Sequence, residues 1–231
     1  MSRGLVFTVC ALFLLILPAQ ASAADLRFQV TTDLGPASGR LFIVIAPRPR
    51  PEPRTLIGEA GASAVPMFAR DVSNLVQGAA AVVDNSAAAF PIESLDELRP
   101  GNYYVQAMLR TNRDLRVIDA PGNLYSDVER VHLDPRDGAT VAIKLVHAIP
   151  EEKLPHEDEY VRYVKIQSRL LTAFHHRPIY LRAGIILPKS YNKSAGRQYP
   201  LRIHIGGYGS RYTAVAGLMA PGSSFRRNWV S

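Results

Sequence analysis

A glycine-rich segment, Gly206–Gly209, is the part of this sequence best suited to chemistry on a ligand. Alternating apolar and polar residues precede it and predict a β-strand over 199–205. Glycines that follow a strand let the backbone approach a ligand closely. Rigid backbone N–H groups about 3 Å from a developing oxyanion can then stabilise its charge.

The candidate oxyanion-loop residues are therefore Gly206, Gly207, Tyr208 and Gly209. Gly207 and Tyr208 offer the most suitable N–H groups, and the Tyr208 side chain is expected near the pocket. His204 lies on the polar side of the predicted strand. We expect its imidazole to shape the loop through a hydrogen bond rather than to act as a general base. The alternative is a tight turn at the end of the strand that binds no ligand.

Other ligand sites find little support in the sequence. A dinucleotide-binding G-x-G-x-x-G pattern fails at Tyr212, and no Gly-Lys-Ser/Thr follows the glycines. His175 and His176 are adjacent in a predicted turn, so their side chains should point apart. We therefore expect neither a metal site nor a cofactor.

No catalytic residue can be assigned. A nucleophile elbow has the pattern G-x-S-x-G between a strand and a helix, and this pattern occurs nowhere in the chain. Ser210, Ser223 and Ser224 lie near glycines but lack the strand–turn–helix setting. The sequence therefore supplies no recognisable triad.

The first 23 residues have the features of a secretory signal peptide. Arg3 supplies a positive charge, Leu5–Leu17 is apolar, and Ala21–Ala23 is a small-residue cleavage site. The apolar run is shorter than the about 20 residues that a membrane-spanning helix needs. We expect an exported protein, periplasmic or extracellular, with no membrane contact after cleavage. Cleavage would remove Cys10, the only cysteine, so no disulfide is expected.

Charge is distributed unevenly along the chain. Twelve Lys and Arg residues follow position 161, whereas the last acidic residue is Glu159. The switch predicts a boundary near 150–160. The cations are spaced singly, as on solvated strand faces, and do not form the dense runs of nucleic-acid-binding tails. We therefore expect no nucleic-acid partner, although a basic anion-binding surface is the alternative.

Residues 24–150 are predicted to form a β-sandwich. Strands are indicated at 26–30, 39–45, 103–109 and 140–146 by alternation and β-branched or aromatic content, with turns at 100–102 and 134–138. Residues 151–160 are a polar linker. Beyond it, 161–174 and 178–187 are predicted strands around a turn at 175–177, and 199–205 is the third strand. The fold class is thus mainly β.

Three longer sequence segments resemble secreted esterases of the α/β-hydrolase superfamily, related to enterochelin-esterase and prolyl-oligopeptidase-like enzymes. They are PGNYYVQAMLRTN (100–112), APGNLYSDVERVHLDP (120–135), and IQSRLLTAFHHRPIYLRAGIILPKSY with YPLRIHIGGYG (166–209). The resemblance implies an Ig- or transthyretin-like sandwich followed by the opening strands of a hydrolase domain over 161–231. It implies serine-dependent hydrolysis of a small ester or peptide for the complete protein. Family members carry their nucleophile beyond this point, so we expect residues 1–231 to be inactive alone.

A different class of function also fits the sequence. An exported sandwich module could bind a glycan or a protein through exposed aromatic side chains, with Tyr103, Tyr104 and Tyr125 as a stacking platform. Tyrosines in strands are more often core or turn anchors. The sequence does not indicate an oligomeric state.

Overall fold

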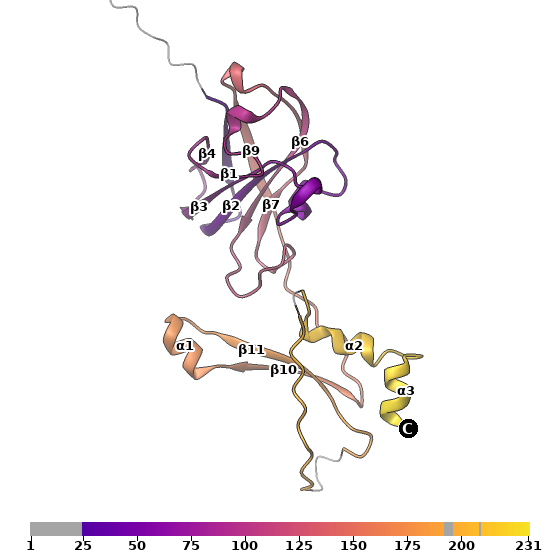
Figure 1. The fold of residues 1–231 in the computed structure, drawn as a ribbon. Coiled ribbons are helices and arrows are strands. Elements are labelled where there is room, and N and C mark those ends of the chain that lie inside the picture. The colour runs from indigo at the N-terminus through magenta and orange to yellow at the C-terminus, as the bar shows by residue number, and fades with distance from the viewer. Residues whose placement is uncertain (1–24, 192–195, 208) are drawn as a thin grey trace, which may run out of the picture.

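The computed structural model describes residues 25–191, 196–207 and 209–231. The predicted signal peptide and Tyr208 lie outside these ranges. Two β-sheets follow one another along the chain, joined by an extended segment (Figure 1). None of the helices in the described ranges is long and apolar enough to cross a membrane.

The first sheet contains nine strands and confirms the predicted β-rich region. They are β1 (Arg27–Thr32), β2 (Ala37–Ala46), β3 (Met67–Leu75), β4 (Ala81–Val83), β5 (Ala88–Phe90), β6 (Gly101–Arg110), β7 (Leu124–Ser126), β8 (Glu129–Leu133) and β9 (Thr140–Ala148). Short 3₁₀ turns interrupt the connections: η1 (Pro53–Leu56), η2 (Gly61–Ser63), η3 (Leu95–Glu97) and η4 (Pro135–Asp137). All four strands predicted from local patterns are present.

The strand order is β4-β1-β9-β7-β6-β2-β3-β5, and β8 also pairs with β6. The β1–β9 pair is parallel and the other pairs are antiparallel. The sheet is therefore mixed. The parallel pair joins the first and last strands of the region, a relationship that local patterns do not reveal.

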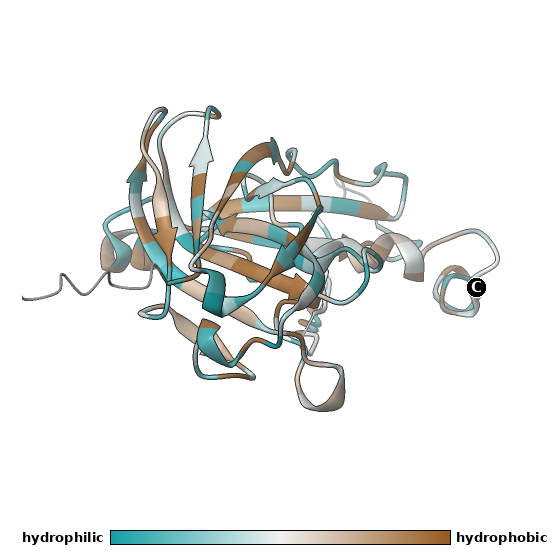
Figure 2. Ribbon diagram, turned by 90° about the horizontal axis from the view of Figure 1, so that it is seen from above, coloured by the Kyte–Doolittle hydropathy of each residue, from teal (hydrophilic) through white to brown (hydrophobic). Residues whose placement is uncertain are grey.

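One apolar cluster holds this sheet together. It includes inward-facing residues from strands at both ends of the order, among them Phe28, Ile43, Phe68, Val105 and Leu145. Apolar and polar residues alternate along several strands (Figure 2), which is the pattern expected when one face of each strand is buried. Because distant strands share one core, this region can bury enough apolar surface to fold around it.

The second sheet is a two-stranded antiparallel hairpin of β10 (Val161–Gln167) and β11 (Tyr180–Ile186). The prediction of strand over 161–174 was wrong for its second half, where helix α1 spans Arg169–His175. Ser168 ends the strand, because its hydroxyl accepts a hydrogen bond from the Leu171 N–H and caps the helix. His176 ends α1 in a left-handed conformation (φ 52°).

The predicted strand at 199–205 is not formed. The part of the chain that the structure describes provides no strand beside it, so its backbone has no ladder to join. After it come η5 (Tyr212–Ala214), α2 (Val215–Leu218) and α3 (Ser224–Val230). The helices lie beside the hairpin (Figure 1), and the Trp229 Nε1–H donates to the Leu187 carbonyl at 2.8 Å.

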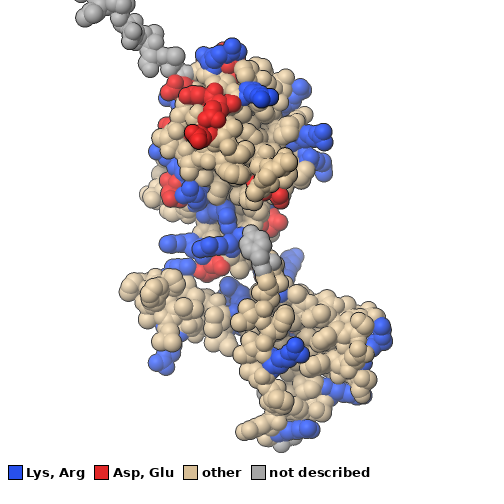
Figure 3. Space-filling view, in the orientation of Figure 1, with Lys and Arg blue, Asp and Glu red and all other residues tan. Residues whose placement is uncertain are grey.

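Acidic side chains gather on the first sheet and at the junction, whereas the second sheet and its helices show Lys and Arg (Figure 3). Among the described residues, four ion pairs join these acids to the basic end of the chain. They are Arg177–Asp114, Arg211–Glu152, Arg226–Asp158 and Arg162–Glu157. The basic end of the chain is thus partly neutralised by the acids that precede it.

Candidate functional site

The glycine segment ends in a tight turn. The Ser210 N–H donates to the Gly207 carbonyl at 3.0 Å, and Gly209 has a φ of 79°. Such a positive φ suits glycine, which has no Cβ to clash with the backbone. Tyr208, one of the two proposed donors, lies outside the described residues.

Gly206 has a structural reason to be glycine. A Cβ at this position would lie 2.4 Å from the Ser210 Cβ and 2.5 Å from its Oγ, closer than real side chains pack. A Cβ on Gly207 would meet no atom within 4 Å. Gly206 therefore serves the turn itself, whereas Gly207 is open to the surroundings, as a ligand-facing backbone would be.

His204 is exposed, and its ring forms no hydrogen bond with any described residue. The loop-shaping role predicted for His204 stays a prediction. The oxyanion role of the glycine segment stays a prediction. It needs a nucleophile, and the sequence supplies no nucleophile elbow.

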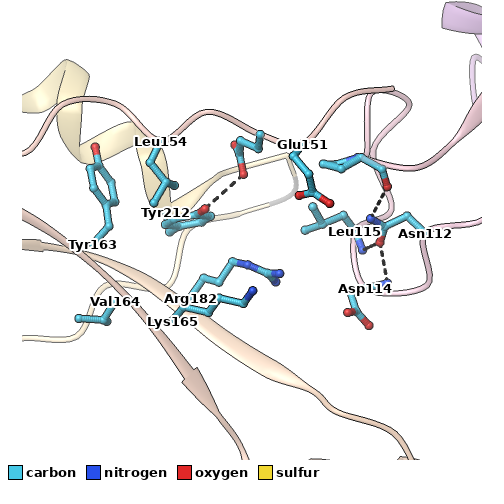
Figure 4. A pocket seen from close by; sticks show the side chains of 12 residues that line it. Asn112, Asp114, Leu115, Glu151, Leu154, Tyr163, Val164, Lys165, Arg182 and Tyr212 are labelled. Carbon is cyan, nitrogen blue, oxygen red and sulfur yellow. Dashed lines mark hydrogen bonds between the residues drawn. The ribbon is translucent and has the colours of Figure 1, made fainter. Parts of the chain in front are cut away.

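A second site emerges at the junction of the two sheets. A cavity of about 260 Å³ lies between the 112–121 loop, the 151–154 segment and the β10–β11 hairpin (Figure 4). Beside it, a more open hollow of about 430 Å³ reaches α1 and Ser210. Asp114, Leu115, Arg182 and Tyr212 line both. We call the two together the junction cleft.

Two cations lie side by side on the hairpin wall of the cleft. Lys165 of β10 and Arg182 of β11 are direct register partners, so their side chains leave the same face of the hairpin. Both extend towards the wall formed by Leu115 and Glu151 (Figure 4). The Lys165 ammonium also lies 4.5 Å from the centroid of the Tyr180 ring, a cation–π distance.

Most of the acids near the cleft are already paired. Asp114 accepts an ion pair from Arg177 at 2.7 Å, and Glu152 accepts one from Arg211 at 2.7 Å. Lys165 and Arg182 form no ion pair with any residue of the described ranges. The cleft therefore keeps uncompensated positive charge.

Tyr212 closes the cleft from the side of η5. Its hydroxyl donates to Glu152 Oε2 at 3.2 Å, and burial, reinforced by the Glu152 carboxylate, raises its pKa. The close approach depends on Gly184, where a Cβ would lie 2.3 Å from the Tyr212 carbonyl oxygen and 2.4 Å from Val215 Cγ2. A glycine in β11 thus lets η5 lie directly on the hairpin.

The loop on the opposite wall is built by Asn112. Its side-chain oxygen accepts from the N–H groups of Asp114 and Leu115, each at 2.9 Å, and its amide nitrogen donates to the Pro121 carbonyl at 2.9 Å. These bonds fix the backbone that carries Asp114 into the cleft. Asn112 is consequently a structural residue of the site.

The sequence analysis did not predict this site. It placed Lys165 and Arg182 as singly spaced cations on a solvated face, because the register that pairs them is set across α1, which was not predicted. Alternation alone could have placed each on the same face of its strand as a tyrosine (Tyr163 and Tyr180). It could not have shown that the 112–121 loop faces them.

The tyrosine platform of the binding-module hypothesis is not assembled as one exposed surface. All three tyrosines are half-buried. The Tyr103 hydroxyl donates to the Arg99 carbonyl at 2.7 Å, and Tyr125 stacks on His147 with ring centroids 4.8 Å apart. Adjacent Tyr103 and Tyr104 also point to opposite faces of β6.

The described residues contain no group of three or more His, Cys, Asp or Glu side chains placed to hold a metal ion. Comparisons with protein-family models, with curated proteins and with solved structures found no match.

Proposed function

We propose that this chain is the N-terminal part of an exported serine hydrolase acting on a small ester or peptide. Residues 24–150 would form an Ig- or transthyretin-like sandwich, 151–160 the linker, and 161–231 the opening segment of an α/β-hydrolase domain. Gly206–Gly209 would supply its oxyanion element. The 231 residues alone would be inactive, since no nucleophile elbow is present.

The exposed apolar residues before the glycines carry the proposal. The side chains of Leu201, Ile203 and Ile205 are 83%, 74% and 89% exposed. A strictly alternating apolar segment of this kind is stable in water only when a neighbouring strand and a covering layer bury it. A larger parallel sheet with helices on its faces would provide both.

The hairpin supports the same interpretation. Ile166 and Leu181 are register partners on the face opposite Lys165 and Arg182, and they are 59% and 54% exposed. The hairpin thus exposes two apolar side chains on the face away from Lys165 and Arg182, and Leu181 also borders the second hollow of the junction cleft. Further layers of a catalytic domain would cover such a face.

A fluorophosphonate probe, which labels activated serine nucleophiles, tests the proposal. Antibodies raised against residues 25–150 would retrieve the natural gene product from the exported fraction of its source cells. We expect a labelled polypeptide, and no labelling of the pure 231-residue chain. An unlabelled natural product would contradict the proposal.

Variants of the natural product would test the oxyanion element itself. Gly207→Ala adds a methyl group that meets nothing within 4 Å in the chain, yet it would crowd a bound substrate. We expect kcat/KM to fall more than about tenfold. Gly217→Ala, also at an open position, is the matched control and should leave kcat/KM unchanged.

A further inference from the structure

We propose that the junction cleft binds a small organic anion, with its oxyanion held between Arg182 and Lys165. This inference concerns a site separate from the glycine segment, and it does not depend on esterase activity. It rests on the placement of charges in the cleft.

The charge balance of the cleft favours an anion. Five cations line its two parts: Arg113, Lys165, Arg177, Arg182 and Arg211. Three acids face them, and two of these, Asp114 and Glu152, are held by Arg177 and Arg211. Within the described ranges, Glu151 is the one lining acid without an ion-pair partner, whereas the cations Arg113, Lys165 and Arg182 have none.

The geometry favours an oxyanion in particular. The planar guanidinium of Arg182 can donate two parallel hydrogen bonds to a carboxylate or a phosphate. The Lys165 ammonium, from the neighbouring register position, supplies a second charge beside it. Both groups face a cavity shared with the apolar side chains of Leu115 and Leu154, so the ligand would carry a short carbon skeleton.

The size of the cleft limits the ligand. The part of the cleft that both Lys165 and Arg182 line has a volume of about 260 Å³, just below the about 300–1,000 Å³ range of sites for drug-sized molecules. A short-chain mono- or dicarboxylate would fit. Glu151 on the opposite wall would repel one end of such an anion and would therefore weaken its binding.

Succinate is a suitable probe, with neutral succinamide as its isosteric control. The 231-residue chain, labelled with ¹⁵N, would be titrated at low ionic strength while amide shifts are followed. We expect saturable shifts centred on residues 163–165, 180–182 and 212, and none with succinamide. Inorganic phosphate at the same concentrations shows whether the site accepts any oxyanion or requires the carbon skeleton.

Variants then test the assignment in both directions. Arg182→Gln should raise the dissociation constant of succinate at least about tenfold, and Lys165→Gln by several-fold. Lys189→Gln, on an exposed residue outside the cleft, should change nothing. Glu151→Gln should tighten binding several-fold, a gain that misfolding cannot produce.

Three results would overturn the proposal. They are shifts that rise linearly with concentration, shifts that scatter over basic residues elsewhere, and a dissociation constant that is the same for Arg182→Gln and the wild type. The amide spectrum of each variant shows directly whether the fold is intact, so a loss caused by unfolding is recognised as such.

Discussion

Arg211 and Glu152 are joined by an ion pair of 2.7 Å between Nη2 and Oε2, and the Tyr212 hydroxyl donates to the same carboxylate oxygen at 3.2 Å. This relationship ties the segment after the glycines to the segment that leaves the first sheet. Both ion-pair side chains are about three-quarters buried. The pair therefore lies in a setting where solvent screens it less than at an open surface.

Replacing Arg211 by alanine should loosen the attachment of η5. The change leaves the Glu152 carboxylate with only the Tyr212 hydroxyl, and we expect a loss of about 1–2 kcal/mol in unfolding free energy. Urea unfolding followed by the fluorescence of Trp229, the only tryptophan, measures it. Lys153→Ala, at an exposed neighbouring position, is the control. Equal midpoints for the two variants would contradict the prediction.

Gly184→Ala should displace η5 from the hairpin. The added Cβ would overlap the Tyr212 carbonyl oxygen and Val215 Cγ2, and relief of such overpacking costs about 1–3 kcal/mol. We expect a lower midpoint of Trp229 fluorescence and weaker binding at the junction cleft. Ala183→Gly, on the adjacent residue, separates this effect from a general loss of strand propensity. Unchanged stability of Gly184→Ala would show that η5 is not held against β11.

Gly206→Ala and Gly207→Ala should differ in their effect on the turn. The first substitution forces a methyl group against Ser210, whereas the second meets open space. We expect the Ser210 amide to exchange with solvent at least about tenfold faster in Gly206→Ala, because its bond to the Gly207 carbonyl is lost. Hydrogen exchange measured by NMR would contradict this if both variants matched the wild type.

Asp158 should make the second sheet sensitive to acid. Its carboxylate accepts from the N–H groups of Tyr160 at 2.8 Å and Val161 at 2.9 Å. These bonds, the Tyr160 bond foremost, lower its pKa below the ordinary 3.8, and Arg226 adds to the effect.

A carboxylate with a lowered folded-state pKa stabilises the fold above its ordinary pKa, and this stability is lost as the pH falls through the folded value. We therefore expect the urea midpoint of Trp229 fluorescence to fall below about pH 4. Asp158→Asn should have a lower midpoint at neutral pH and a flatter dependence on acid. A wild-type and a variant profile that run parallel would refute this role.

Local pattern predicted four of the nine strands of the first sheet, β1, β2, β6 and β9, and did not predict the other five. Runs such as Arg27–Thr32 and Thr140–Ala148 alternate because one face of each is buried. Their parallel pairing stayed hidden, since it joins residues more than a hundred positions apart. The residue pattern of either strand alone does not indicate which distant strand it pairs with.

The second half of the chain was harder to predict. Residues 168–174 mix apolar and polar types in a way that suits a strand or a helix, and the Ser168 cap decides for the helix. The alternation at 201–205 predicted a strand that the described residues cannot pair. The cation pair at Lys165 and Arg182 depends on a hairpin register set across α1, which the sequence does not specify.

Reading the genomic DNA beyond the codon for Ser231 tests the hydrolase proposal most directly. We expect an open frame that continues into a Gly-x-Ser-x-Gly nucleophile elbow, followed by an acid and a histidine. Unrelated sequence after Ser231 in all three frames would contradict it. The chain would then be considered an exported binding protein, with the junction cleft as its site.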